Sequence, residues 1–370
     1  EVLRGPQGTL YGKNTIGGTI SIVTEKPTNE FHGEASLQYG NFGFNQETLL
    51  LSGAIVEDKF LLLGSFIRKE RDGYIYNRLR RQDINGYEGW GGRLRALIMP
   101  SDSVTLDLAA DYYTQDGSEA LQTVTYVPLP FPPYNALPQP DPNNRIVDLD
   151  APILGERTVW GTSARIDIDL DGLTLTGIAA YREYTSAFQD DSDGLPLDEF
   201  SVGRAEDASI SSQELRLTSD EGNAFSWIAG LYFYQENLDS VNNINLGPLF
   251  PSALFRLPPL PASFRERALT NASVDERSWA AFGSFTYDFN EKLRLAAGVR
   301  FTHEDKDLAY SQLATTLVSG LIYAFALPIS PRTDSLSEGE WTGDVSLTYK
   351  ITPENVVYAK YSRGYKAGGF

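Results

Sequence analysis

The chain has 370 residues and a formal net charge of −18, and it contains no cysteine. Without cysteine there can be no disulfide framework and no thiolate metal site, and the acidic balance argues against a surface that binds nucleic-acid phosphates. Tyrosine and phenylalanine are abundant, with 20 and 19 copies, which favours strands over helices. No apolar run approaches the roughly 18 residues of a transmembrane helix.

The chain opens on a glycine-rich unit, EVLRGPQGTLYGKNTIGGTISIVTEKP. EVLRG predicts a short strand, GPQG a turn, and GGTISIVT a second strand in which Ile20 and Ile22 lie opposite Ser21 and Val23. Because glycines permit close approach between backbones, we expect the unit to pack inside another structure. The sequence begins within an element, so we expect further residues, including any export signal, ahead of Glu1.

From residue 31 onwards, apolar and polar residues alternate in a series of segments. In SVTLDLAADYY, Val104, Leu106 and Leu108 share one face, while Thr105 and Asp107 share the other. This period of two predicts half-buried strands, and their apolar faces end in aromatic residues, as at a membrane interface. About 13 strands are predicted, over residues 31–40, 44–55, 59–71, 84–98, 103–114, 159–170, 173–186, 207–219, 224–238, 276–289, 292–305, 340–350 and 354–365.

The connections between these strands sort by length. Every second one is tight, with the sequences VED, PSDS, DG, DEGN, NE and TP, while most of the others are long and two are rich in proline. Such sorting is typical of an outer-membrane barrel with short periplasmic turns and long extracellular loops, whereas a β-sandwich has no reason to show it. Because bacterial single-chain barrels have even strand numbers, the odd count predicts that further strands follow residue 370.

The opening unit closely resembles the end of the plug domain of TonB-dependent outer-membrane receptors. SSQELRLTS, WIAGLYFYQE, AFGSFTYDFNEKLRLAAGVRFTHEDK and YAKYSRGYKAGGF resemble barrel segments of the same family. The resemblance covers essentially the whole chain, with the loops carrying least of it. It implies an all-β fold, a transmembrane antiparallel β-barrel of about 22 strands with a plugged lumen. Residues 1–30 would be the C-terminal part of the plug, and residues 31–370 the N-terminal part of the barrel.

The resemblance also implies a function. Such receptors lie in the bacterial cell outer membrane, in contact with its lipid, and bind a scarce ligand at the extracellular face. They import it with energy from the TonB–ExbB–ExbD complex, through a TonB box that would lie upstream of Glu1. A ferric siderophore is the preferred ligand, and cobalamin, carbohydrate or another nutrient stays open. A passive porin would share the barrel without needing the opening unit, and the sorted loops disfavour a soluble binding protein.

The resemblance further implies a latch between plug and barrel. In this family, plug arginines are typically held by barrel glutamates, and Arg4 matches the plug motif while Glu214 and Glu304 match the barrel positions. The strand phase agrees, because Leu215 and Leu217 point outward and Glu214 therefore points into the lumen. The hypothesis is a contact that orders the plug and loosens during transport. The alternative is that these are ordinary luminal charges in water.

Two further groups of residues are candidates for a role. The first, in the opening unit, is expected to serve turns and tight packing, and comprises Gly5, Pro6, Gly8, Gly12, Gly17 and Gly18. The second would either contact ligand at the loop tips or stiffen the loops, and comprises Tyr126, Phe131, Tyr134, Phe250 and Phe255.

The sequence predicts no metal site, no cofactor and no enzyme. The two histidines, His32 and His303, stand in no spacing that resembles a metal site, and nucleotide-binding motifs are absent. A serine–histidine hydrolase would need His303 to face the lumen, but this residue follows the outward phase of Phe301. We therefore treat catalysis as the weakest of the alternatives.

Overall fold

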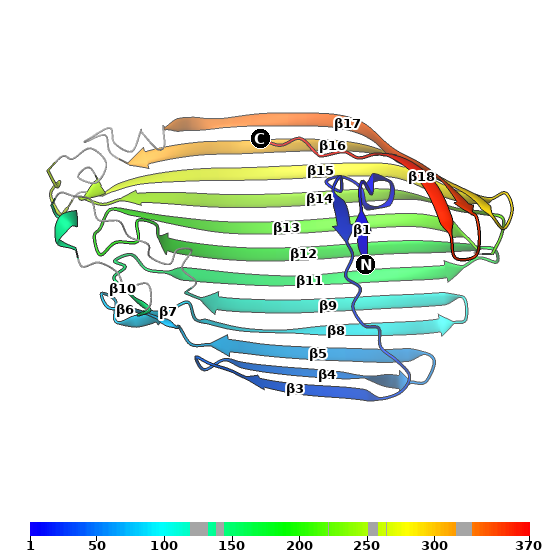
Figure 1. Ribbon diagram of the computed structural model, residues 1–370, viewed down its shortest axis with the longest axis horizontal. Coiled ribbons are helices and arrows are strands. Elements are labelled where there is room, and N and C mark those ends of the chain that lie inside the picture. Colours follow the sequence, from blue (N-terminus) through cyan, green and yellow to red (C-terminus); the bar gives the residue numbers. More distant parts are fainter. Residues whose placement is uncertain (119–131, 138–143, 221, 251–257, 264, 316–327) are drawn as a thin grey trace.

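The computed structural model describes residues 1–118, 132–137, 144–220, 222–250, 258–263, 265–315 and 328–370. Its main feature is a curved 13-stranded antiparallel sheet, in which successive long strands of the chain lie side by side (Figure 1). Strands β3 and β18 form its two edges, so the wall is open within the described residues.

The wall contains all of the strands predicted from sequence. They are β3 (His32–Tyr39), β4 (Asn45–Val56), β5 (Phe60–Arg71), β8 (Tyr87–Ser101), β9 (Val104–Gly117), β11 (Leu154–Asp169), β12 (Leu173–Asp191), β13 (Phe200–Ser219), β14 (Phe225–Leu246), β15 (Glu266–Asp288), β16 (Leu293–Thr315), β17 (Ile329–Lys350) and β18 (Val356–Arg363).

Strands β13 to β17 are longer than their sequence pattern predicts, at 20 to 23 residues each. Their additional residues lie at the long-loop end and carry polar side chains on both faces, as in the DSVNNINL end of β14. A barrel strand needs only about 9–11 residues to cross the hydrocarbon. The remainder of each strand stands outside it, where neither face has to be apolar, and the period-two signal is lost.

The outer face of the wall carries an apolar band bounded by aromatic side chains. On β15, Trp279 and Tyr287 are exposed on this face, at 48% and 38%. The step of eight residues from one to the other corresponds to about 26 Å of extended strand, which at the tilt of about 35–45° of barrel strands spans about 20 Å of the roughly 25 Å apolar band of a membrane barrel. Phe301 links two neighbouring rings, with its centroid 5.5 Å from Trp279 and 5.0 Å from Trp341.

A small second sheet caps the long-loop end. It consists of β6 (Ile75–Asn77), β7 (Gln82–Ile84) and β10 (Ile146–Val147), which lie in regions that the sequence pattern predicts as loops apart from Ile84, the first residue of the strand predicted over 84–98. The Asn77 side chain is fully buried and joins β6 to the segment that follows β10. Its Nδ2 donates to the carbonyl of Leu149 (2.9 Å), and its Oδ1 accepts from the Leu149 amide (3.2 Å). Strands of two or three residues are too short to show a period.

Residues 1–30, here called the N-terminal segment, lie on the inner face of the wall (Figure 1). Strands β1 (Val2–Arg4) and β2 (Gly18–Ile20) pair antiparallel, and the short helix α1 (Gly8–Tyr11) lies between them, where the sequence predicts only a turn. Arg95 on the wall holds the residues that connect β2 to β3, since its Nη1 donates to the carbonyls of Thr24 and Glu25 at 2.9 Å. Within the described part of the chain, no helix has the length and apolar character to cross a membrane.

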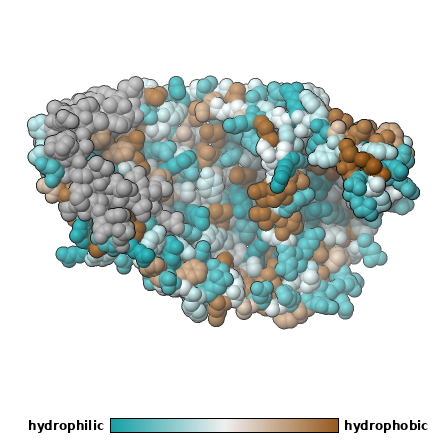
Figure 2. Space-filling view, viewed as in Figure 1, coloured by the Kyte–Doolittle hydropathy of each residue, from teal (hydrophilic) through white to brown (hydrophobic). Residues whose placement is uncertain are grey.

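Figure 2 shows the inner side of the wall, with the N-terminal segment as a brown, apolar patch in front of a more polar surface. The large apolar side chains that the segment exposes are Val2, Leu10, Tyr11, Ile16, Ile20, Ile22 and Val23. Its contact with the wall is therefore made mainly by other groups.

Candidate docking site of the N-terminal segment

Helix α1 is seated on the inner faces of β16 and β17. Thr9 is buried there, and its Oγ1 donates to Oδ1 of Asp344 at 2.7 Å. The approach is so close that a Cβ added at Gly8 would lie 2.9 Å from Cβ of Thr342. Glycine at this position is therefore a condition for seating the helix.

Lys13 forms the centre of the site. Gly12, at φ 77°, ends α1 and turns the chain so that Nζ of Lys13 pairs with both Glu276 and Glu304. Nζ of Lys306 contacts the same two carboxylates, at 3.3 Å and 2.8 Å. The Glu304 side chain is 1% exposed and the Lys13 side chain 21%, so two cations and two carboxylates form a largely buried network with no net charge.

Aromatic rings line this network. Nζ of Lys13 lies 5.2 Å from the ring centroid of Tyr234. The guanidinium of Arg300, buried beneath Gly12, lies 5.3 Å from the ring centroid of Tyr232 and 5.5 Å from that of Phe282. Cation–ring contacts gain strength where water is excluded, so the rings help to retain both cations on the wall.

The structure does not bring Arg4 to either predicted partner. The Arg4 side chain is exposed, and Glu214 accepts instead from Nη1 of Arg216 at 3.1 Å. Glu304 does contact the N-terminal segment, but through Lys13. The ion pair that the resemblance assigns to Arg4 is therefore corrected to Lys13, which is the only other cation among the first 25 residues. The latch role itself stays a prediction.

The remaining candidates in the N-terminal segment divide by how closely they are packed. Gly18, at φ 140°, would place a Cβ 2.4 Å from the carbonyl oxygen of Leu3, so β1 and β2 could not pair with a larger residue there. Gly8 and Gly12 face the wall at short distances, whereas Gly5 and Gly17 have open space around them. Pro6 lies beside Gly364, since a Cβ added at Gly364 would be 3.1 Å from Cβ of Pro6.

Most of the loop aromatics cannot be placed. Tyr126, Phe131 and Phe255, together with the side chain of Tyr134, lie outside the described residues. Phe250 is 8% exposed and packs with Leu246 and Ala268, and its ring centroid lies 6.4 Å from that of Phe200. For Phe250 the packing favours the stiffening role over contact with ligand. Ligand contact by the other loop aromatics stays a prediction.

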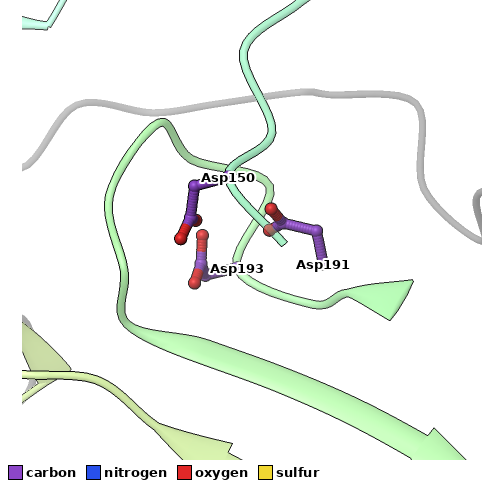
Figure 3. Close-up of side chains that lie close together, drawn as sticks. All are labelled: Asp150, Asp191 and Asp193. Carbon is purple, nitrogen blue, oxygen red and sulfur yellow. The ribbon is translucent and has the colours of Figure 1, made fainter. Parts of the chain in front are cut away.

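Three aspartates meet where the connection before β11 approaches the loop after β12. The carboxylate oxygens of Asp150, Asp191 and Asp193 lie within 4.8 Å of one another (Figure 3). Asp191 and Asp193 each accept two backbone N–H bonds from the surrounding loop residues. An acidic cluster alone does not define a cation site, so the absence of a metal site stays a prediction.

Burial and mutual repulsion perturb these carboxyl groups. Burial, followed by the charge of Asp191, raises the pKa of Asp193 to about 9. Burial also raises the pKa of Asp150 to about 6, again with Asp191 as the next contribution, and it raises the pKa of Asp191. Asp193 is therefore expected to hold its proton at neutral pH and to share it within the cluster.

This cluster gives a testable pH dependence. The pKa of Asp193 in the fold lies above its usual value of about 3.9, so the folded loop binds more protons than the unfolded loop between these two values. Its stability should therefore fall as the pH rises from about 4 to about 9. Amide exchange of residues 192–199, corrected for the intrinsic rate, should show progressively weaker protection over this range.

An Asp193→Asn variant should flatten the profile, because the amide stays neutral throughout. Asp220→Asn, at the opposite end of β13, serves as the matched control and should keep the wild-type profile. A profile that is equally steep in Asp193→Asn would show that another group carries the effect.

Comparison with known proteins places this wall in a family. Residues 89–370 match the family model described as TonB dependent receptor-like, beta-barrel. The chain is 25% identical over 385 residues to the pesticin receptor of Yersinia enterocolitica, covering 100% of this chain and 49% of that protein. Among solved structures, it is similar to the ferric yersiniabactin uptake receptor FyuA from Yersinia pestis, with a TM-score of 0.77, 20% identity, and coverage of 99% of this chain and 51% of that chain. It is also similar to the ferric-catecholate import receptor Fiu from E. coli K12, with a TM-score of 0.69, 16% identity, and coverage of 99% and 59%.

The chain thus spans about half the length of the pesticin receptor and of FyuA. The family match begins in β8 and runs through β18, so it includes every wall residue that contacts Lys13. Barrels of this family lie in the outer membrane of Gram-negative bacteria, in agreement with the apolar band on the outer face. The chain belongs to the TonB-dependent receptor-like β-barrel family.

Proposed function

We propose that the chain is part of an outer-membrane receptor that imports a ferric siderophore. The observation that carries the proposal is the N-terminal segment, which is seated on the inner wall of a receptor-type barrel through the buried Lys13 network. A passive porin gains nothing from such a contact. Ferric yersiniabactin and ferric catecholate appear in the names of solved structures that match nearly the whole of this chain, which favours an iron chelate as ligand.

In this proposal residues 1–30 are the C-terminal part of the plug, and residues 31–370 belong to the barrel. The plug blocks the lumen at rest, and the TonB–ExbB–ExbD complex supplies the energy that loosens it. The Lys13 network is the latch, since its charges balance only while the segment is docked. We propose no catalytic role for the chain.

The inner wall beyond the latch suits an anionic chelate. Tyr310 and Arg332 are paired across β16 and β17, on the inner face and towards the long-loop end. The guanidinium of Arg332 lies 5.6 Å from the ring centroid of Tyr310. A cation beside an aromatic ring can bind both the charge and the aromatic groups of a ferric catecholate or a similar chelate.

Uptake by the full-length receptor in its native host tests this function. We expect its abundance to rise on iron starvation, and we expect deletion of its gene to abolish uptake of radioactive iron supplied on one member of a siderophore panel. Cobalamin and a set of sugars complete the panel as the competing ligands. Unchanged abundance, together with unchanged uptake of every iron chelate, would contradict siderophore import and leave those nutrients as the alternatives.

A further inference from the structure

Residues 364–368 do not extend β18 along the wall. Residues 364–368, here called the strap, leave the wall and cross the inner face towards β16 (Figure 1). Glu338 on β17 holds the strap, because its Oε1 accepts from the Tyr365 hydroxyl and from the Gly368 amide (2.7 Å). Nζ of Lys306 donates to the carbonyl of Gly368 at 2.7 Å. The strap is therefore bound to two wall strands.

The same strap binds the N-terminal segment. The amide of Asn14 donates to the carbonyl of Tyr365 at 3.0 Å, and the amide of Ala367 donates to Oδ1 of Asn14 at 3.2 Å. Packing is tight as well, since a Cβ added at Gly364 would lie 3.2 Å from Cγ1 of Ile16. Backbone and side chain of Asn14 are thus both engaged, directly beside Lys13.

The strap and the docking site share a residue. Nζ of Lys306 contacts Glu304, which holds Lys13, and it also holds the strap through Gly368. The backbone of Lys13 cannot move away from the wall while Asn14 is bonded to the strap, because the two residues are consecutive. Both bonds must break before this part of the segment moves, and because Asn14 is exposed each contributes only the modest net stability of an ordinary hydrogen bond, about 0.5–1.5 kcal/mol.

We propose that the strap fastens the N-terminal segment, and that it must lift from Asn14 before Lys13 can leave Glu276 and Glu304. The inference rests on the proposed function, in which release of this segment is a step of transport. It assigns residues 364–368 a role in gating rather than in building the wall.

A disulfide that ties the strap to the wall without touching the N-terminal segment tests this order of events. An added Cβ at Gly368 lies 2.7 Å from Cδ2 of Leu336 on β17, so the two positions are in direct side-chain contact and are the pair chosen for cysteine substitution. The sequence of residues 1–370 contains no cysteine. The double variant Gly368→Cys with Leu336→Cys, made in the full-length receptor, can therefore form no other bridge within these residues. Its reduced form and the single Gly368→Cys variant are the controls.

The readout is amide exchange of residues 8–20 in the purified full-length receptor, which needs no ligand. Oxidation should slow this exchange by roughly tenfold or more, the scale set by one or two net hydrogen bonds, and reduction should restore it. Unchanged exchange with the bridge verified by mass spectrometry would overturn the proposal. So would failure of the two cysteines to pair under oxidant, since the strap would then not lie against β17.

A second variant acts in the opposite direction. Tyr365→Phe removes the hydroxyl that bonds Glu338 and keeps the ring, so exchange of residues 8–20 should become several-fold faster. Wild-type exchange in this variant would argue against fastening. Uptake by the unmodified receptor is measured in parallel. Absence of all uptake there would contradict the proposed transport function, whereas the exchange results would still decide the role of the strap.

Discussion

Replacement of Lys13 by methionine should release the N-terminal segment from the wall. The substitution keeps an unbranched side chain of similar length but leaves Glu276 and Glu304 with Lys306 as the one remaining cation of the network. Removing one partner of a buried ion pair typically costs 3–5 kcal/mol, and because the Lys13 side chain is 21% exposed we expect a value of roughly 3 kcal/mol. Amide exchange of residues 8–20 should accelerate by about a hundredfold, since each 1.4 kcal/mol corresponds to about tenfold.

Two matched variants separate the charge from other effects. Lys13→Arg restores a cation and should retain slow exchange and transport. Arg4→Ala removes the exposed cation that the family resemblance assigns to the latch, and it should leave both close to wild type. A larger effect from Arg4→Ala than from Lys13→Met would reverse the assignment made from the structure.

A charge placed on the outer wall should have the second large effect, and its size should depend on height. Val299 on β16 is 50% exposed, midway along the strand between Leu295 and His303, whose partners on β15 are Tyr287 and Trp279 of the aromatic boundaries. Val299→Arg would place a cation near the middle of the apolar band, at a cost of about 2–4 kcal/mol. We expect this loss of stability in urea unfolding of the full-length receptor in lipid vesicles.

Asp305→Arg is the control, because it lies on the same face of the same strand but beyond the aromatic boundary. It should cost no more than about 1 kcal/mol. Equal effects at the two positions would mean that the band between Trp279 and Tyr287 is not the part of the wall in contact with lipid.

Sequence periodicity was informative wherever one face of a strand meets lipid. β9 and the first half of β16 alternate clearly, and their positions and phases are confirmed, including the outward position of His303, whose ring centroid lies 5.8 Å from that of Trp279. Periodicity failed beyond the aromatic boundary, where β13 to β17 continue with polar residues on both faces. It also failed for β6, β7 and β10, which are too short to show a period; the buried Asn77 of β6 is bonded to Leu149, just after β10.

The site depended on tertiary placement that no spacing reveals. Glu304 could be assigned to the lumen from the phase of its strand, but the sequence did not predict its partner Lys13, because that contact depends on the direction of the chain after Gly12. The strap contact joins Asn14 to residues near position 366, and the aspartate cluster joins two loops. In each case residues far apart in the sequence are brought together only by the tertiary fold.

The height of the long strands has a mechanical consequence. On β15, thirteen residues separate Glu266 from Trp279, which is about 43 Å of hydrogen-bonded strand beyond the aromatic boundary. Within the described residues, the wall beyond the aromatic boundary is therefore continuous sheet on these strands, which resists bending far better than free loops of the same length. A receptor built in this way can adapt to a new ligand by exchanging single inward-facing side chains, because alternate residues along each strand face the opening while the register of the wall stays fixed.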